Sequence, residues 1–283
     1  AAWLGVFTTH VAAGYQQPVG GLPQPATELG NALDTSPPSP DVAIAVFNAV
    51  QSWLRQWQTP MDPAGQQPVT GASTTLRYLG AVIGRGMQLP TEMTGSPGVV
   101  IAAASHALNE AKERMPVERD ALLEENLKAA AGQVMLSVEL AGHPVPLMIN
   151  DFADAIDLVG PGLDGVAVRI GDRMQAMFPE TMLVTGLDAA AALRGLVSTV
   201  SGDATLSLKK AGELREQHGV RFYRFEAIHV TQMKAGGGPE FLHRGGQVVS
   251  LASIDAAGLR KWAERLAEHL WLQRDPLGGV FGT

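Results

Sequence analysis

The chain has 283 residues, of which 46% are hydrophobic and 17% charged, a composition typical of a globular protein with a sizeable core. Its formal charge of −7 disfavours a general nucleic-acid or anionic-membrane surface, because such surfaces depend on clustered lysine and arginine. The sequence contains no cysteine, which excludes disulfides, thiolate metal sites and a cysteine nucleophile.

The first 40 residues are predicted to be a signal-peptide remnant and a linker. Residues 1–13 are mostly apolar and end in a small-residue pattern that fits a signal-peptidase site. Residues 16–40 are rich in Pro, Gly, Gln and Thr and offer little apolar surface to pack. Export to a periplasmic or extracellular location is predicted, and a cytoplasmic location with a buried first segment is the alternative. Because no run reaches the ~18 to 20 apolar residues that span a bilayer, no membrane span is expected in the mature domain.

Helical spacing of apolar residues predicts five helices. The first starts at Ser39 and Pro40, a capping side chain followed by a residue with helical φ. Its apolar face includes Trp53 and Trp57, which favour a core role over ligand stacking. Further helices are predicted over residues 97–115, 118–131 and 188–200, and an amphipathic helix over 255–274 ends the chain.

Strands are predicted where apolar residues alternate or β-branched and aromatic residues gather. These segments are residues 74–78, 133–140, 166–178 and 220–231. The third is a hairpin, because Gly171 and Asp172 suit a two-residue turn. The resulting fold class is α+β, with an antiparallel or mixed sheet flanked by helices.

Several motifs resemble the AMMECR family, named for the AMME syndrome candidate gene. Residues 79–84 read Leu-Gly-Ala-Val-Ile-Gly where the family has Leu-Arg-Gly-Cys-Ile-Gly. Later motifs follow in the family's order, at residues 134–146, 162–179 and 223–226. The resemblance covers roughly residues 41–232 and implies a two-lobed α+β domain, but it brings no settled activity. Residues 233–283 are expected to form a glycine loop and an amphipathic helix, with a further domain as the expected continuation.

The candidate binding site is the glycine-rich stretch that follows the first predicted strand. The family's Arg and Cys fall at Gly80 and Val82, so their chemistry does not transfer. Arg77 and Arg85 are expected to flank a turn and to hold an anion beside free backbone N–H groups. Glycines at three positions, Gly80, Gly84 and Gly86, complete this tentative site. Solvated arginines on a turn are the alternative interpretation.

Other candidate residues lie later in the chain. His229 and His243 are the histidine pair to examine, because a glycine loop connects their segments. Arg224 lies where basic and aromatic residues interleave, a pattern able to stack single-stranded nucleic acid, although the net charge makes a nucleic-acid partner unexpected. The histidine spacing matches no metal motif, and neither a metal nor a cofactor is predicted.

Three functional hypotheses remain open at this point. The leading one is a non-catalytic binding or accessory module of a longer, exported protein, with a small-molecule or glycan ligand. The alternative is an enzyme with a cleft beside residues 79–87, in which Arg77 or Arg85 holds an anionic substrate and a histidine acts as the base. The third is a nucleic-acid-associated module.

Overall fold

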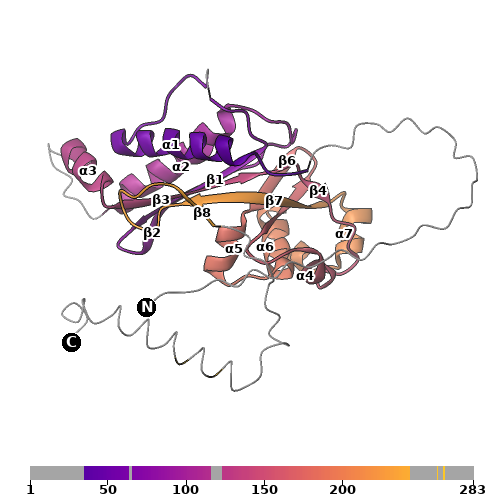
Figure 1. The fold of residues 1–283 in the computed structure, drawn as a ribbon. Helices are drawn as coiled ribbons and strands as arrows, with labels where there is room; N and C mark the ends of the chain where they lie inside the picture. Colours follow the sequence, from indigo (N-terminus) through magenta and orange to yellow (C-terminus); the bar gives the residue numbers. More distant parts are fainter. Residues whose placement is uncertain (1–34, 64–65, 116–122, 243–259, 261–263, 265–283) are drawn as a thin grey trace, which may run out of the picture. The chain divides into compact units, whose positions relative to one another are not determined.

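The computed structural model describes residues 35–63, 66–115 and 123–242, together with residues 260 and 264. The chain divides near residue 34, and these residues belong to the unit Asp34–Thr283. They form an α+β fold in which helices cover an antiparallel sheet (Figure 1). Predictions for residues 1–34, for His243 and for most of the final helix lie outside the described residues.

Groups of helices and pairs of strands follow one another in chain order. They are α1 (Pro40–Gln56), β1 (Gly71–Tyr78), β2 (Ala81–Gln88), α2 (Gly98–Arg114), α3 (Leu123–Ala131), β3 (Val134–Ala141), β4 (Val145–Pro146), α4 (Asp154–Leu158), β5 (Asp164–Ile170), β6 (Arg173–Met177), α5 (Pro179–Thr185), α6 (Ala189–Ser201), the 3₁₀ turn η1 (Ala204–Leu208), α7 (Ala211–Gln217), β7 (Arg221–Thr231) and β8 (Glu240–Phe241).

The sheet has the strand order β2-β1-β3-β7-β5-β6, and the short strands β4 and β8 both pair with β7. Strand β7 joins the two halves of the sheet, because its second half pairs with β3 and its first half with β5. Two residues beyond β7 also join the sheet: Phe241 of β8 pairs with Val230, and Glu240 pairs with Thr231. The loop before β8 contacts the sheet where the side-chain amide of Gln232 donates to the carbonyl of Gly237 at 2.8 Å.

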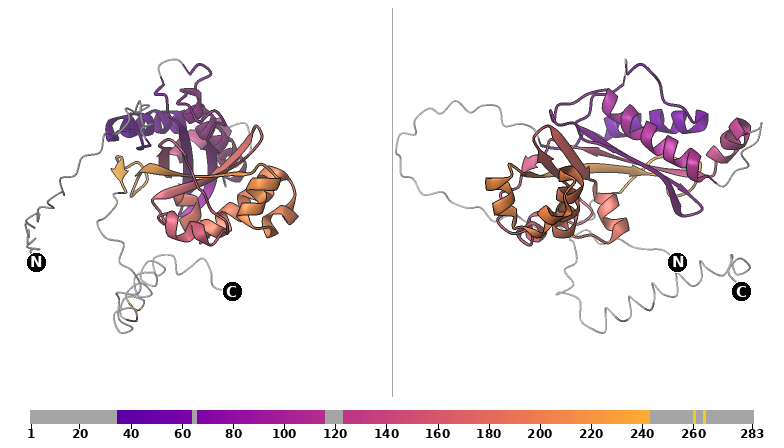
Figure 2. Two further views of the ribbon diagram at one scale, coloured as in Figure 1. Left: turned by 90° about the vertical axis from the view of Figure 1, so that its right-hand side faces the viewer. Right: turned by 180° about the vertical axis from the view of Figure 1, so that it is seen from behind.

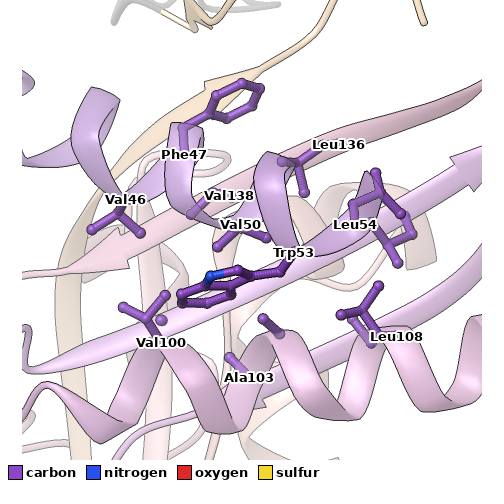
Figure 3. Packing of buried hydrophobic residues seen from close by; sticks show 14 of the residues in the cluster. Val46, Phe47, Val50, Trp53, Leu54, Val100, Ala103, Leu108, Leu136 and Val138 are labelled. Carbon is purple, nitrogen blue, oxygen red and sulfur yellow. The ribbon is translucent and has the colours of Figure 1, made fainter. Parts of the chain in front are cut away.

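Helices α1 and α2 pack on one side of β1 and β3 and form the first hydrophobic core. Ser39 caps α1 and Pro40 begins it, as predicted. Figure 3 shows Trp53 of α1 lying toward Val100 and Ala103 of α2. Trp57 is buried as well, and its indole N–H donates to the carbonyl of Leu127 at 2.6 Å. Both tryptophans are therefore core residues.

A second hydrophobic core lies between the other half of the sheet and helices α4 to α7. Val166 and Val168 of β5 and Phe222 of β7 face α6, which Asp188 caps through the amide of Ala191 at 2.7 Å. Figure 2 shows the two helix groups against different parts of the sheet.

The two edges of the sheet curl toward each other. Leu89, next to β2, shares a third small core with Ala176 of β6, although β2 and β6 are the opposite edges. The centre of this core is Phe225 of β7, whose ring meets Phe178 at 5.0 Å between centroids. The sheet thus has an outer face under the helices and an inner face that looks into the curl. We call the latter the interior face.

The structure contains two hairpins, and the sequence predicted only one of them as a hairpin. Gly171 and Asp172 connect β5 and β6 with a φ of 62° at the glycine, and this hairpin is confirmed. The glycine-rich stretch is a second hairpin rather than a long turn. Only Leu79 and Gly80 form its loop, with φ of 50° and 82°, as a type I′ turn requires.

Candidate functional site

Polar side chains line the interior face of β1, β2, β3 and β7. Alternation along each strand places odd-numbered residues on this face, and the pairing register aligns them across neighbouring strands. These residues are Ser73, Thr75 and Arg77 on β1, Arg85 and Met87 on β2, Ser137 and Glu139 on β3, and His229 and Thr231 on β7. The outer face of the same strands is largely apolar, so the polarity is confined to one side.

Glu139 is the most deeply buried charged residue of this face, with a relative exposure of 0%. One carboxyl oxygen accepts a hydrogen bond from the backbone N–H of Glu180 at 2.8 Å, while Oε2 has no partner among the described residues. Burial, reinforced by the negative charge of Glu180, raises the pKa of Glu139 to about 8. At neutral pH Glu139 is therefore mostly a neutral acid that can donate a proton.

Glu180 reaches this face because β6 leads directly into α5. Pro179 occupies the first turn of α5, where its fixed φ and missing N–H suit a helix start. The carboxylate of Glu180 forms an ion pair with the guanidinium of Arg77. Its other oxygen lies 3.7 Å from Nε2 of His229. Glu180 therefore connects the arginine of β1 with the histidine of β7.

His229 lies directly opposite Glu139 in the pairing of β3 with β7. Its Nε2 lies 2.5 Å from the hydroxyl of Ser137, which belongs to the same face. Burial lowers the pKa of His229, and the nearby Arg77 acts in the same direction, while Glu180 opposes both. His229 is thus a neutral imidazole at pH 7, with one nitrogen able to accept a proton.

Arg85 supplies a second cation. Its backbone N–H, on the exposed edge of β2, donates to Glu110 of α2 at 2.6 Å. The buried Nε of its side chain has no partner within the described residues. We call Arg77, Arg85, Ser137, Glu139, Glu180 and His229 the interior cluster. With two guanidiniums, one paired carboxylate and a protonated Glu139, its net charge at pH 7 is about +1.

A cavity of about 180 Å³ lies in the gap between the edge strands, next to Met87 of the interior face. Met87 lines the cavity together with Leu89 on one side and Ala176 on the other. The Met87 sulfur accepts a hydrogen bond from Thr181, the residue next to Glu180, at 3.6 Å. A small molecule in the gap would therefore contact Met87, which lies two residues from Arg85 on the same face of β2.

The structure brings together three of the predicted site residues and separates the others. Arg77, Arg85 and His229 lie on the interior face. Arg224 lies on the opposite face of β7, because it is five residues from His229, and it is 3.6 Å from Asp164. His243 lies outside the described residues.

The three glycines have structural roles that differ from the expected ligand site. Gly80 is in the exposed hairpin loop. Gly84 and Gly86 lie inside β2 and are covered by α2. A Cβ at Gly84 would lie 2.0 Å from the carbonyl oxygen of Ala107, and one at Gly86 would lie 1.9 Å from that of Ala103. These two glycines permit close packing of helix on strand, and this packing, rather than a ligand, accounts for them.

Ser137, Glu139 and Glu180 were not predicted from the sequence. The sequence did mark Ser137 and Glu139 as unusual, because they are the polar positions of an otherwise apolar strand. Both lie on the face of that strand opposite Val138. Such positions ordinarily face solvent, and only the curl of the sheet makes them interior. Glu180 follows a proline at a helix start, a position that indicates a cap rather than a site.

Within the described residues, no group of three or more His, Asp or Glu side chains is arranged to hold a metal ion. In the interior cluster Arg77 already neutralises Glu180, which disfavours a cation. Among the helices described, none alone has the length and apolarity to cross a membrane, and α5 and α6 qualify only as a pair bent by 103°.

Comparison with known proteins supports the fold alone. No family model matches the chain, and no curated protein matches it. The chain is similar in structure to the uncharacterized protein PH0010 from Pyrococcus horikoshii, with a TM-score of 0.51 and 14% sequence identity. The alignment covers 71% of this chain and 96% of that one. At this identity the likeness concerns the arrangement of helices and strands.

Proposed function

We propose that the protein catalyses proton transfer on a small anionic substrate at the interior cluster. The observation that carries the proposal is the pairing of Glu139 with His229 on adjacent strands, a buried carboxylic acid opposite a partly buried imidazole, beside two guanidiniums. Acid–base catalysis needs a proton donor and a proton acceptor held near neutral pH in one site.

The roles within the cluster follow from charge and protonation. The side chain of Arg85 holds the anionic group of the substrate, because its Nε is buried without a partner among the described residues and Arg77 is already paired with Glu180. His229 accepts a proton from the substrate, and Ser137 orients the imidazole. Glu139 in its neutral form donates a hydrogen bond, or its proton, to the oxygen on which negative charge develops.

The unpaired polar atoms support a ligand at this place. Oxygen atoms of Thr75, Glu139 and Glu180 are buried without a hydrogen-bond partner among the described residues, as is Nε of Arg85. Leaving a buried polar group unsatisfied costs roughly 1 to 3 kcal/mol. With the hydroxyl of Ser73, five such atoms lie on one face, as expected where a polar ligand completes the hydrogen bonding.

The AMMECR family remains the proposed affiliation of the chain. It is supported by the order of the family-like motifs, which fall on the β1–β2 hairpin, β3, the β5–β6 hairpin and β7. The interior cluster draws on β1, β2, β3 and β7, and on α5, which follows the β5–β6 hairpin. Replacement of the family's Arg and Cys by Gly80 and Val82 does not affect the proposed chemistry, because neither position belongs to the interior cluster.

Binding of a small anion tests the charge assignment. Arg85→Met should weaken the binding of acetate to the full chain by about tenfold or more, the range expected when a hydrogen bond to a charged group is lost. The affinity can be measured by chemical-shift titration. The matched control is Arg55→Met on the exposed surface of α1, which should leave the affinity unchanged. Equal affinities for the two variants would remove Arg85 from the site.

Exchange of carbon-bound hydrogen with solvent tests catalysis. In heavy water, the full chain should introduce deuterium at the carbon next to the carbonyl of a small oxo acid, such as the methyl group of pyruvate, measured by NMR. The rate should decline as the pH rises through about 8, where Glu139 loses its proton, and as acid protonates His229 below its usual pKa range. Glu139→Gln and His229→Asn should abolish the exchange, whereas exposed Glu125→Gln should not.

The second candidate function is binding without chemistry, the leading hypothesis from the sequence. The interior cluster contains no activated nucleophile: Ser137 contacts a neutral histidine, but the side chain is 1% exposed. Anion binding that depends on Arg85, without exchange across a panel of small carboxylates, would favour this second candidate over the enzyme.

A further inference from the structure

A second, larger cavity lies on the outer side of the gap between the edge strands. Its volume is about 420 Å³, within the range of ligand pockets. The end of β2 and the loop after it line one side, the β5–β6 hairpin lines another, and Thr199 and Val200 of α6 complete the wall. The hydroxyl of Thr91 donates to the carbonyl of Asp172 at 2.9 Å and fixes the loop to the hairpin.

This outer cavity adjoins the smaller cavity beside Met87, because the two share lining residues. Both are lined by Gln88 and Leu89 on the β2 side and by Met174 and Gln175 on the β6 side. The inner cavity adds Met87, which Thr181 contacts next to Glu180. A ligand that lies along the gap would therefore have one end at Met87, near Arg85 on the same face of β2, and the other in the outer cavity.

The lining of the outer cavity is polar but has no single charge. The amide groups of Gln88 and Gln175 each offer donors and an acceptor, and neither makes a side-chain hydrogen bond within the described residues. The hydroxyl of Thr199 donates to the carbonyl of Gly195 at 3.0 Å and keeps its lone pairs free. Glu92, Asp172 and Arg173 carry mixed charges, which disfavours a second anionic group.

We propose that the outer cavity binds the uncharged, hydroxyl-bearing part of the same ligand, so that the substrate is a sugar-acid-like molecule rather than a simple small anion. The proposal rests on the proposed function for the position of the anionic end. It assigns Gln88 and Gln175 to recognition of hydroxyl groups, because a side-chain amide can donate to and accept from a hydroxyl in one contact.

Three probes of matched chemistry, applied to the full chain, test the anion site and the hydroxyl subsite separately. Glucuronate carries both groups, acetate carries only the carboxylate, and glucose carries only the hydroxyls. We expect glucuronate to bind at least tenfold more tightly than acetate, measured by calorimetry or chemical-shift titration. If glucuronate binds no more tightly than acetate, the subsite is overturned and the proposed anion site stands. If neither anion binds, both proposals fail.

Two variants and a control then test which residues cause the tighter binding of glucuronate. Gln175→Leu should lower the affinity for glucuronate roughly fivefold, the size of one uncharged hydrogen bond, and leave the affinity for acetate unchanged. The matched control is Gln217→Leu on the exposed end of α7, which should change neither affinity. Arg85→Met should weaken the binding of acetate and of glucuronate by the same factor. Weaker glucuronate binding in the Gln217 control, or unchanged glucuronate binding in the Gln175 variant, would overturn the assignment of Gln175 to hydroxyl recognition.

Discussion

Glu139→Gln should make the free energy of unfolding much less dependent on pH than it is in the native chain. The carboxyl of Glu139 has a pKa raised from 4.5 to about 8 in the folded protein. Between these two values the unfolded chain has lost the proton and the folded chain has kept it. Raising the pH therefore favours unfolding by about 1.4 kcal/mol per pH unit in the native protein.

This pH dependence of stability has the opposite direction to that of an ordinary salt-bridged carboxylate. Stability from the neutral Glu139 is fully present below pH 4.5 and is lost as the pH rises through about 8. Glutamine keeps the shape of the neutral acid, still accepts from the amide of Glu180, and does not titrate. Relative to the native chain, the variant should gain about 3 to 5 kcal/mol between pH 4.5 and pH 8.

The measurement is urea unfolding of both proteins at several pH values, followed by tryptophan fluorescence. Exposed Glu125→Gln on α3 is the control, and its stability should run parallel to that of the native chain. Parallel curves for Glu139→Gln as well would mean that Glu139 is ionised in the folded protein at neutral pH. That result would also remove Glu139 as the acid of the proposed mechanism.

The sequence predicted the elements whose signals are local. Helix α1 was predicted from Ser39 and Pro40, and the β5–β6 hairpin from Gly171 and Asp172, because a cap or a tight turn depends only on neighbouring residues. The α+β class followed from these elements. Contacts between distant segments could not be predicted in the same way.

The candidate site was only partly predictable for that reason. Arg77 and His229 were selected by their chemistry, but the sequence does not indicate that β1 and β7 both flank β3. Glu139 is polar in an alternating strand, which ordinarily indicates solvent, and its burial depends on the curl that brings the opposite sheet edges together. Glu180 reaches it from 41 residues further along the chain. The strand order and the curl of the sheet, rather than a sequence motif, bring the residues of the site together.

Gly86→Ala should destabilise the folded chain strongly, by at least about 3 kcal/mol. A Cβ at this position would lie 1.9 Å from the carbonyl oxygen of Ala103 and 2.8 Å from Cβ of His106. The first obstacle is helix backbone, which cannot rotate away as a side chain can, so α2 must move off β2. Overpacking of a core typically costs roughly 1 to 3 kcal/mol and occasionally more, and a clash with backbone belongs at the upper end.

A second glycine provides a control for this substitution. A methyl group at Gly195, within α6, would have no atom of the described residues within 4 Å, so Gly195→Ala should stabilise the chain by up to about 1 kcal/mol through helix propensity. Urea unfolding monitored by tryptophan fluorescence suits both variants, because Trp53 packs against α2 (Figure 3). In Gly86→Ala the folded-state emission should also shift, since displacement of α2 opens the environment of Trp53. Unchanged stability and emission in Gly86→Ala would contradict the close packing of α2 on β2, and with it the position of Arg85, which Glu110 of α2 holds through its backbone N–H.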